Sequence, residues 1–255
     1  MIKLEGNKFS IGGASFQLIS NLADMFKLKE SDGLVIAKTR RYLDKYIALR
    51  ASEQNLQNVF ELGIFRGGST AFLSEFLAPR RLVAIDYNRK PVAALDKYIE
   101  EAGKSMSVRP YYGVNQADTV ALERIVADEF QGQPLDLVID DASHMLEETR
   151  VSFNCLFPKL RAGGLYIIED WAWAHTKSVT SAITATNPLA GKASLANLIV
   201  EIQLAAVAMP ELIDEVVVND AFVLVRKGNK PADPGFDVSA CGLLMDNRTQ
   251  GRIFI

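Results

Sequence analysis

Cysteine is scarce in this chain: its 255 residues include two, Cys155 and Cys241. One lies in an apolar helical stretch and the other near the carboxyl end, so the pair does not resemble the disulfide framework of a small secreted protein. The first residues also lack the charged-then-apolar order of a signal peptide. We therefore expect a protein of the reducing cytoplasm.

Long apolar runs and a strong charge imbalance are missing too. No apolar stretch reaches the roughly 18 residues that a membrane-spanning helix needs. The 28 basic and 31 acidic residues leave a net charge of −3, which gives no general attraction to nucleic acid or to an anionic membrane. We expect neither among the partners. With 49% hydrophobic residues, the composition is that of a globular protein.

Patterns typical of strands and helices alternate along most of the chain. Apolar runs such as Leu135–Ile139 and Leu165–Ile168 are separated by a stretch with apolar residues at helical spacing. The alternation ends with two strands, Glu215–Val218 and Phe222–Val225, so close together that they must form an antiparallel hairpin. This order predicts an α/β fold: a doubly wound, mostly parallel seven-stranded sheet with a terminal antiparallel hairpin.

Three regions are expected along the chain. Residues 1–50 would form an N-terminal helical cap or lid, or an oligomer contact, with an amphipathic helix over residues 34–49. Residues 51–228 would form the sheet domain, and residues 229–255, rich in Pro, Gly and Asp, an irregular tail. We expect the protein to be a homo-oligomer.

A glycine-rich turn, E-L-G-I-F-R-G-G-S from Glu61 onward, follows the first strand of the predicted sheet. Gly63 permits a tight exit from the strand, and Gly67 and Gly68 allow a ligand to approach the backbone at the start of a helix. Asp86 ends the next strand, where a carboxylate can bind both hydroxyls of a ribose. Glu61 would repel a pyrophosphate, so it favours a cationic ligand such as S-adenosylmethionine. A plain tight turn is the alternative for the glycines alone.

These features resemble the class I S-adenosylmethionine-dependent methyltransferases over roughly residues 59–226. The pattern E-x-G-x-x-x-G-x-S, the acidic end of the second strand and the terminal hairpin carry the resemblance. It implies a Rossmann-like methyltransferase fold, with residues 51–228 as the S-adenosylmethionine-binding domain. It also implies that Asp118 lies on the adenine side of the cofactor and that Asp140 faces its amino or sulfonium end. The residues implied to line the methionine and ribose parts are Glu61, Gly63, Gly67, Ser69 and Asp86.

Two acidic pairs, Asp140-Asp141 and Glu169-Asp170, stand at the ends of neighbouring strands. Parallel strands would bring both pairs, together with His144, to the same edge of the sheet. Crowded carboxylates raise one another's pKa, so a divalent cation would stabilise such a cluster, and oxygen ligands suit Mg²⁺. Considered one at a time, each acidic residue could instead be solvated or cap a helix. The histidine could instead be an ordinary residue at a helix start.

The sequence Asp-Asp-Ala-Ser-His, with the later Gly-Gly-Leu-Tyr-Ile-Ile-Glu-Asp, resembles one group of methyltransferases in particular. These are the metal-dependent sugar O-methyltransferases of macrolide biosynthesis, of the mycinamicin type, and their relatives associated with cephalosporin biosynthesis. The resemblance implies that Asp141, Glu169 and Asp170 hold Mg²⁺ and that His144 is the general base. Asp141 and His144 would then be the catalytic residues.

The expected function is therefore methylation of a hydroxyl of a small natural product, with S-adenosylmethionine and Mg²⁺ as cofactors and a sugar as the first choice of acceptor. An alcohol has a pKa near that of water, about 15.7, against about 6.5 for histidine; the gap is worth about 12 kcal/mol, and a metal close to the acceptor oxygen would narrow it. A catechol or phenol acceptor is the nearest alternative. A nicotinamide-dependent oxidoreductase is disfavoured by the glycine spacing, and a non-catalytic ligand-binding relative by the intact acidic cluster.

Overall fold

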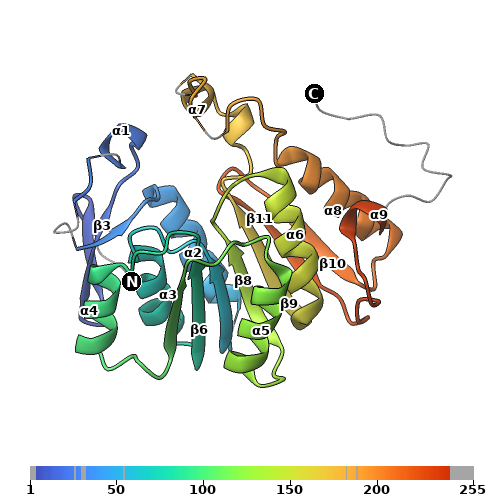
Figure 1. The fold of residues 1–255 in the computed structure, drawn as a ribbon, viewed down its shortest axis with the longest axis horizontal. Coiled ribbons are helices and arrows are strands. Elements are labelled where there is room, and N and C mark those ends of the chain that lie inside the picture. Colours follow the sequence, from blue (N-terminus) through green and yellow to red (C-terminus); the bar gives the residue numbers. More distant parts are fainter. Residues whose placement is uncertain are drawn as a thin grey trace. The chain divides into compact units, whose positions relative to one another are not determined.

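Strands and helices alternate through most of the chain in the computed structural model (Figure 1). The chain divides into two compact units, residues 1–115 and residues 116–255. None of the described helices is both long enough and apolar enough to cross a membrane. The residues that the structure describes are 4–25, 27–29, 33–53, 55–181, 183–187 and 189–241.

The first unit begins with a four-stranded sheet in the order β1-β2-β3-β4, whose first three strands are antiparallel and whose last two are parallel. The helix predicted over residues 34–49 is confirmed only from Arg40, where α2 begins. Four strands lie where helices were expected, because strands this short show no clear two-residue period in the sequence. The role of residues 1–50 as a cap, a lid or an oligomer contact stays a prediction. The elements are β1 (Leu4–Glu5), β2 (Lys8–Ile11), β3 (Ala14–Leu18), α1 (Leu22–Met25), β4 (Leu34–Ile36) and α2 (Arg40–Ser52).

The rest of the first unit is a repeat of strand and helix in which β5, β6 and β7 run parallel. The strand β5 is buried along its whole length, including its two polar residues, Asn58 and Glu61. The elements are β5 (Asn58–Leu62), α3 (Gly68–Leu77), β6 (Arg81–Asp86), α4 (Ala93–Glu101) and β7 (Val108–Tyr112).

The second unit continues the repeat and ends in the predicted hairpin. The strands β8 and β9 are parallel, and β11 runs antiparallel to both β9 and β10. The predicted helix before β9 ends as a short 3-10 helix, η2, where Pro158 follows the last turn of α6. The elements are α5 (Thr119–Phe130), β8 (Leu135–Asp140), α6 (Leu146–Leu156), η2 (Phe157–Lys159), β9 (Leu160–Glu169), η3 (Trp173–His175), α7 (Lys177–Thr180), α8 (Ala196–Ala208), β10 (Ile213–Val218), β11 (Phe222–Lys227) and α9 (Val238–Cys241).

The seven strands from β5 to β11 form one sheet in the order β10-β11-β9-β8-β5-β6-β7. The prediction of a mostly parallel seven-stranded sheet with a terminal antiparallel hairpin is thus confirmed. The domain boundaries expected at residues 50 and 228 stay predictions. Of the predicted irregular tail, residues 242–255 lie outside the described part of the chain.

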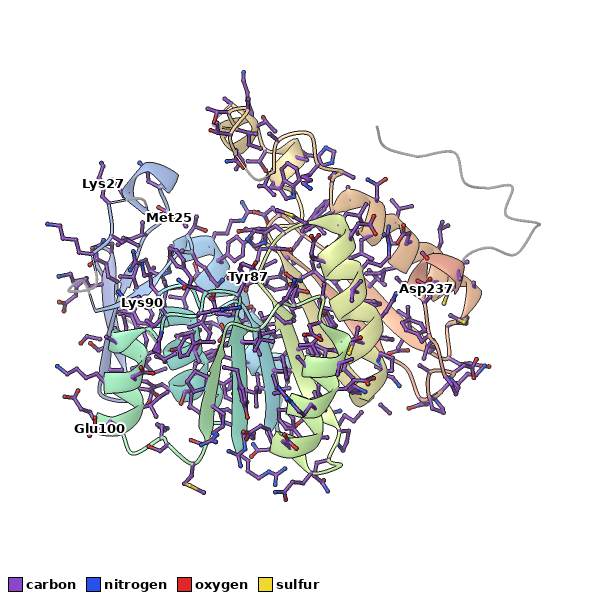
Figure 2. The ribbon with its side chains drawn as sticks, viewed as in Figure 1. Met25, Lys27, Tyr87, Lys90, Glu100 and Asp237 are labelled. Carbon is purple, nitrogen blue, oxygen red and sulfur yellow. The ribbon has the colours of Figure 1, made fainter. Side chains whose placement is uncertain are left out.

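The part of the tail that is described is tied to α6. Asp237 lies just before α9 (Figure 2), and its Oδ1 accepts a hydrogen bond from Asn154 Nδ2 at 3.0 Å. In return the backbone N–H of Val238 donates to Asn154 Oδ1, also at 3.0 Å. These bonds fix the carboxyl-terminal segment against a helix of the sheet domain.

Arg150 on α6 forms a two-pronged ion pair with Glu201 on α8, with Nε–Oε2 at 2.9 Å and a terminal guanidinium nitrogen to Oε1 at 2.7 Å. The two side chains are only 17% and 21% exposed. Replacing Arg150 with Met should lower the free energy of unfolding by about 1–3 kcal/mol, because Glu201 loses charge-assisted hydrogen bonds in a largely buried position. Urea unfolding measures this loss.

The matched control is Arg40→Met, which removes an ion pair between Arg40 and Asp44 whose side chains are 56% and 52% exposed. An exposed pair of this kind is worth about 0.5 kcal/mol or less. Equal losses in the two variants would contradict a stabilising role for the pair between α6 and α8.

Candidate functional site

The turn after β5 is held by Asp86, the last residue of β6. Its Oδ2 accepts hydrogen bonds from the backbone N–H groups of Ile64 at 3.0 Å and Phe65 at 2.8 Å, and its Oδ1 accepts one from Asn88 at 2.7 Å. Phe65 has a φ of 49°, which a residue with a side chain seldom adopts. The carboxylate predicted to bind a ribose therefore also fixes the shape of the glycine-rich turn.

The glycines of this turn are required by backbone geometry and by packing. Gly63 has a φ of 101°, which glycine adopts far more readily than other residues and which confirms the predicted tight exit from the strand. A Cβ on Gly67 would lie 2.6 Å from the Cβ of Leu95, and a Cβ on Gly68 would lie 2.0 Å from the carbonyl oxygen of Val35. Close packing alone thus explains Gly67 and Gly68, and the approach of a ligand to them stays a prediction.

Glu61 is buried in β5, with 1% of its surface exposed, and its Oε2 accepts a hydrogen bond from Thr70 Oγ1 at 2.6 Å. Thr70 lies in the first turn of α3, next to Ser69. The carboxylate is therefore joined to the start of the helix that follows the turn. The cofactor contacts predicted for Glu61 and Ser69 remain predictions.

Asp118 caps α5. Its Oδ1 accepts a hydrogen bond from the backbone N–H of Ala121 at 3.0 Å, and the residue is exposed. An acidic side chain in this position satisfies one of the N–H groups that a helix start leaves without a partner. Capping explains the residue without a ligand, and its place on the adenine side of a cofactor stays a prediction.

Asp140, by contrast, is enclosed inside the second unit, with 2% of its surface exposed. Its Oδ2 accepts hydrogen bonds from Ser152 Oγ at 2.7 Å and from the Tyr166 hydroxyl at 3.0 Å, and Gln116 Nε2 lies 3.3 Å from both carboxylate oxygens. Burial raises the pKa of Asp140 to about 6, while the hydrogen bonds from Ser152 and Tyr166 favour the charged form. The cofactor contact predicted for Asp140 stays a prediction.

The partners of this buried carboxylate were not among the residues predicted from the sequence. Ser152 stands on the inward-facing stripe of the predicted helix, and a hydroxyl on such a stripe is a signal that a buried polar partner exists. Gln116 and Tyr166 carry no such signal, because nothing in the sequence places them near Asp140.

Asp141, His144 and Asp170 come together at the ends of β8 and β9. His144 Nε2 lies 3.9 Å from Asp141 Oδ1 and 3.9 Å from Asp170 Oδ2. One ligand atom from each of the three residues lies within 4.8 Å of the others. The side chains of Asp141, His144 and Asp170 are 21%, 25% and 52% exposed, so solvent and small molecules reach the cluster.

Two of these three residues have left-handed backbone conformations. The φ angles are 56° at His144 and 50° at Asp170. Neither residue is a glycine, and such conformations cost of order 1–3 kcal/mol unless the surrounding structure holds them. The backbone is thus bent at both sides of the cluster so that the side chains face one another.

Glu169, the last residue of β9, is buried with 1% of its surface exposed. It does not belong to the group that the described residues form around His144. Successive side chains of a strand point to opposite faces, which gives a physical reason for the different surroundings of Glu169 and Asp170. The metal-binding role predicted for Glu169 stays a prediction.

The donor atoms of the cluster fit a divalent cation. Asp141 and Asp170 present two carboxylates within reach of one small ion, and their negative charges would repel each other without a positive partner. Mg²⁺ is commonly held by one or two carboxylates and several waters, which the exposure of this cluster allows. The same carboxylate and water ligands also suit Mn²⁺.

Part of the chain is similar to known proteins. The stretch of residues 60–171 matches the family model described as a methyltransferase domain. The matched region contains the glycine-rich turn, Asp86 and the cluster of Asp141, His144 and Asp170.

Among curated proteins, the mycinamicin VI 2''-O-methyltransferase of Micromonospora griseorubida is 33% identical over 124 residues, which cover 46% of this chain and 28% of that protein. The demethylmacrocin O-methyltransferase of Streptomyces fradiae is 62% identical over 37 residues, 14% of this chain and 9% of that protein. The chain therefore spans less than a third of the length of each of these relatives.

Among solved structures, the MycE methyltransferase of mycinamycin biosynthesis, in complex with Mg and SAH, is similar with a TM-score of 0.55 and 25% identity. The similarity covers 79% of this chain and 54% of that one. A second structure of that enzyme contains Mg, SAH and mycinamycin VI, with a TM-score of 0.52, 26% identity, and coverage of 74% of this chain and 48% of that one. The predicted Rossmann-like methyltransferase fold is confirmed by this likeness.

Proposed function

We propose that this protein is an S-adenosylmethionine-dependent O-methyltransferase that needs a divalent metal and methylates a hydroxyl of a small natural product, with a sugar hydroxyl as the acceptor. The observation that carries the proposal is the cluster of Asp141, His144 and Asp170 within a methyltransferase domain. The relatives named as sugar or macrolide O-methyltransferases support the choice of acceptor.

The roles follow from the chemistry of each group. S-adenosylmethionine supplies a methyl group on a positively charged sulfur. Asp141 and Asp170 would hold the divalent cation, which supplies a Lewis acid that makes a nearby hydroxyl more acidic. His144 takes the proton of the acceptor hydroxyl at Nε2, the ring atom that faces both carboxylates. Asp86 would bind the cofactor ribose, next to the turn that it already orders.

Titration of S-adenosylhomocysteine into the metal-free protein, repeated with Mg²⁺, tests the cofactor part. We expect micromolar affinity, and a separate heat for Mg²⁺. Asp86→Asn should weaken the affinity by about 10- to 100-fold, because a hydrogen bond to a charged group contributes about 1.5–3 kcal/mol. The matched control is Glu100→Gln, which removes an exposed charge from α4 in the same unit (Figure 2). No binding with or without Mg²⁺ would overturn the proposal.

Transfer of labelled methyl groups to a panel of acceptors tests the substrate class. The panel contains a glycosylated macrolide, the same macrolide without its sugar, and a simple catechol. Labelling of the glycosylated compound alone is the expected result. Labelling of the catechol alone would overturn the choice of a sugar acceptor while leaving O-methyl transfer in place. Reduction of NAD, with no methyl transfer, would show that the protein is an oxidoreductase.

A further inference from the structure

Trp173 contacts both sides of the acidic cluster. Its backbone N–H donates a hydrogen bond to the carbonyl oxygen of Asp170 at 3.2 Å. Its indole Nε1–H donates a hydrogen bond to the carbonyl oxygen of His144 at 2.9 Å. The residue is 8% exposed, and a buried indole usually has a partner for its N–H, so this hydrogen bond is costly to lose.

The two residues that Trp173 contacts are those with left-handed backbones. His144 has a φ of 56° and Asp170 a φ of 50°. The direction of a carbonyl group depends on these backbone angles, so a donor fixed on the His144 carbonyl also fixes the backbone from which the imidazole projects. One residue therefore restrains both strained positions of the cluster.

A second contact holds the same turn from the other side. Gln116 Oε1 accepts a hydrogen bond from the backbone N–H of Ser143 at 2.8 Å, and Gln116 Nε2 donates to Ser152 Oγ at 3.2 Å. Ser143, just before His144, is thereby anchored to the buried network around Asp140. With one side of the turn fixed in this way, the indole of Trp173 supplies the link to the segment that carries Asp170.

We infer that Trp173 is a positioning residue: its indole N–H ties the turn that carries Asp141 and His144 to the segment that carries Asp170, and so sets the distance between the two carboxylates. This inference rests on the proposed function for the identity of the metal, and on the hydrogen bonds alone for the positioning. If the indole ring acted only by packing, its N–H would not be needed. A variant that keeps an aromatic ring but lacks the N–H therefore distinguishes packing from positioning through the hydrogen bond.

Trp173→Phe removes the N–H and keeps most of the ring. The chain offers a matched control in Trp171→Phe, because Trp171 Nε1 also donates to a backbone carbonyl, that of Asn219 in the turn between β10 and β11, at 2.8 Å. Both variants lose one indole hydrogen bond from the same segment. Only Trp173→Phe loses the bond to His144.

The first readout is the affinity of the folded protein for Mn²⁺ alone, measured from the free-ion signal in electron paramagnetic resonance. We expect Trp173→Phe to raise the Kd by about tenfold or more, the size of effect seen when a residue that orients metal ligands is removed. Trp171→Phe should leave the Kd near that of the wild type. Thermal unfolding of both variants shows whether each remains folded.

The second readout does not need a metal. The chain contains two histidines, His144 and His175, so the ring signals in a long-range ¹H–¹⁵N spectrum can be assigned with a single variant, His175→Asn. We expect the His144 ring signals to shift or broaden in Trp173→Phe and to stay unchanged in Trp171→Phe.

The two readouts separate failure of the inference from failure of the proposed function. Unchanged Mn²⁺ affinity and unchanged ring signals in Trp173→Phe, or equal changes in both tryptophan variants, would overturn the positioning role. Absence of Mn²⁺ binding by the wild-type protein would remove the metal from the proposed function, and the ring signals would still decide the role of Trp173.

Discussion

Replacing His144 with glutamine is expected to lower kcat for methyl transfer by about 10²- to 10⁴-fold, the usual contribution of a general base. Glutamine is polar but has no basic nitrogen, so the acceptor hydroxyl would have to lose its proton to water. The measurement is single-turnover transfer of labelled methyl groups to the acceptor found in the panel, at saturating S-adenosylmethionine and Mg²⁺.

The matched control for this variant is His175→Gln, which changes the other histidine of the chain. His175 Nε2 lies 3.1 Å from Ser194 Oγ. It does not belong to the cluster that the described residues form around Asp141. We expect its kcat to stay close to that of the wild type. Equal losses in the two variants would contradict a specific role for His144.

His144 can act as a base or as a metal ligand, and Mn²⁺ affinity distinguishes the two. As a base, His144 leaves the carboxylates of Asp141 and Asp170 to hold the ion, so His144→Gln should bind Mn²⁺ almost as tightly as the wild type. The glutamine variant also keeps the backbone carbonyl that accepts the hydrogen bond from Trp173. A fall in Mn²⁺ affinity as large as the fall in kcat would make His144 a ligand in place of a base.

The second large effect is expected from the carboxylates. Asp141→Asn and Asp170→Asn should each lower kcat/KM by about 100- to 1,000-fold, because Lewis-acid assistance is worth several kcal/mol and each 1.36 kcal/mol is tenfold in rate. An amide has nearly the size of the carboxylate but carries no charge for the cation. Mn²⁺ affinity should fall in both variants.

The control for these variants is Glu147→Gln, which removes a carboxylate from the first turn of α6, close in sequence to the cluster but outside it. Glu147 is 75% exposed and pairs with Arg150. Activity that persists in Asp141→Asn, and that also persists in the wild type after treatment with a chelator, would show that methyl transfer needs no metal.

The larger sheet was predictable because strands and helical patterns alternate along the chain and several of the strands are rich in apolar residues. Two buried strands were predicted at Leu135–Ile139 and Leu165–Ile168, and both are found, as β8 and β9. The small sheet of β1 to β4 was not predictable in this way. Its strands have from 2 to 5 residues, too few for a two-residue period to stand out among polar residues.

The sequence by itself determined which chemical groups meet at the ends of β8 and β9: parallel strands joined by a helix bring both acidic pairs and His144 to one edge of the sheet. Only the tertiary structure decided which of these groups are buried and which face His144. Asp140 turns inward to Ser152 and Tyr166, and Glu169 is buried, whereas Asp141 and Asp170 face His144. The reason is physical: side-chain direction at a strand end depends on local backbone angles, which are left-handed at His144 and Asp170. The carbonyl of His144 accepts a hydrogen bond from Trp173, a residue 29 positions away in the sequence.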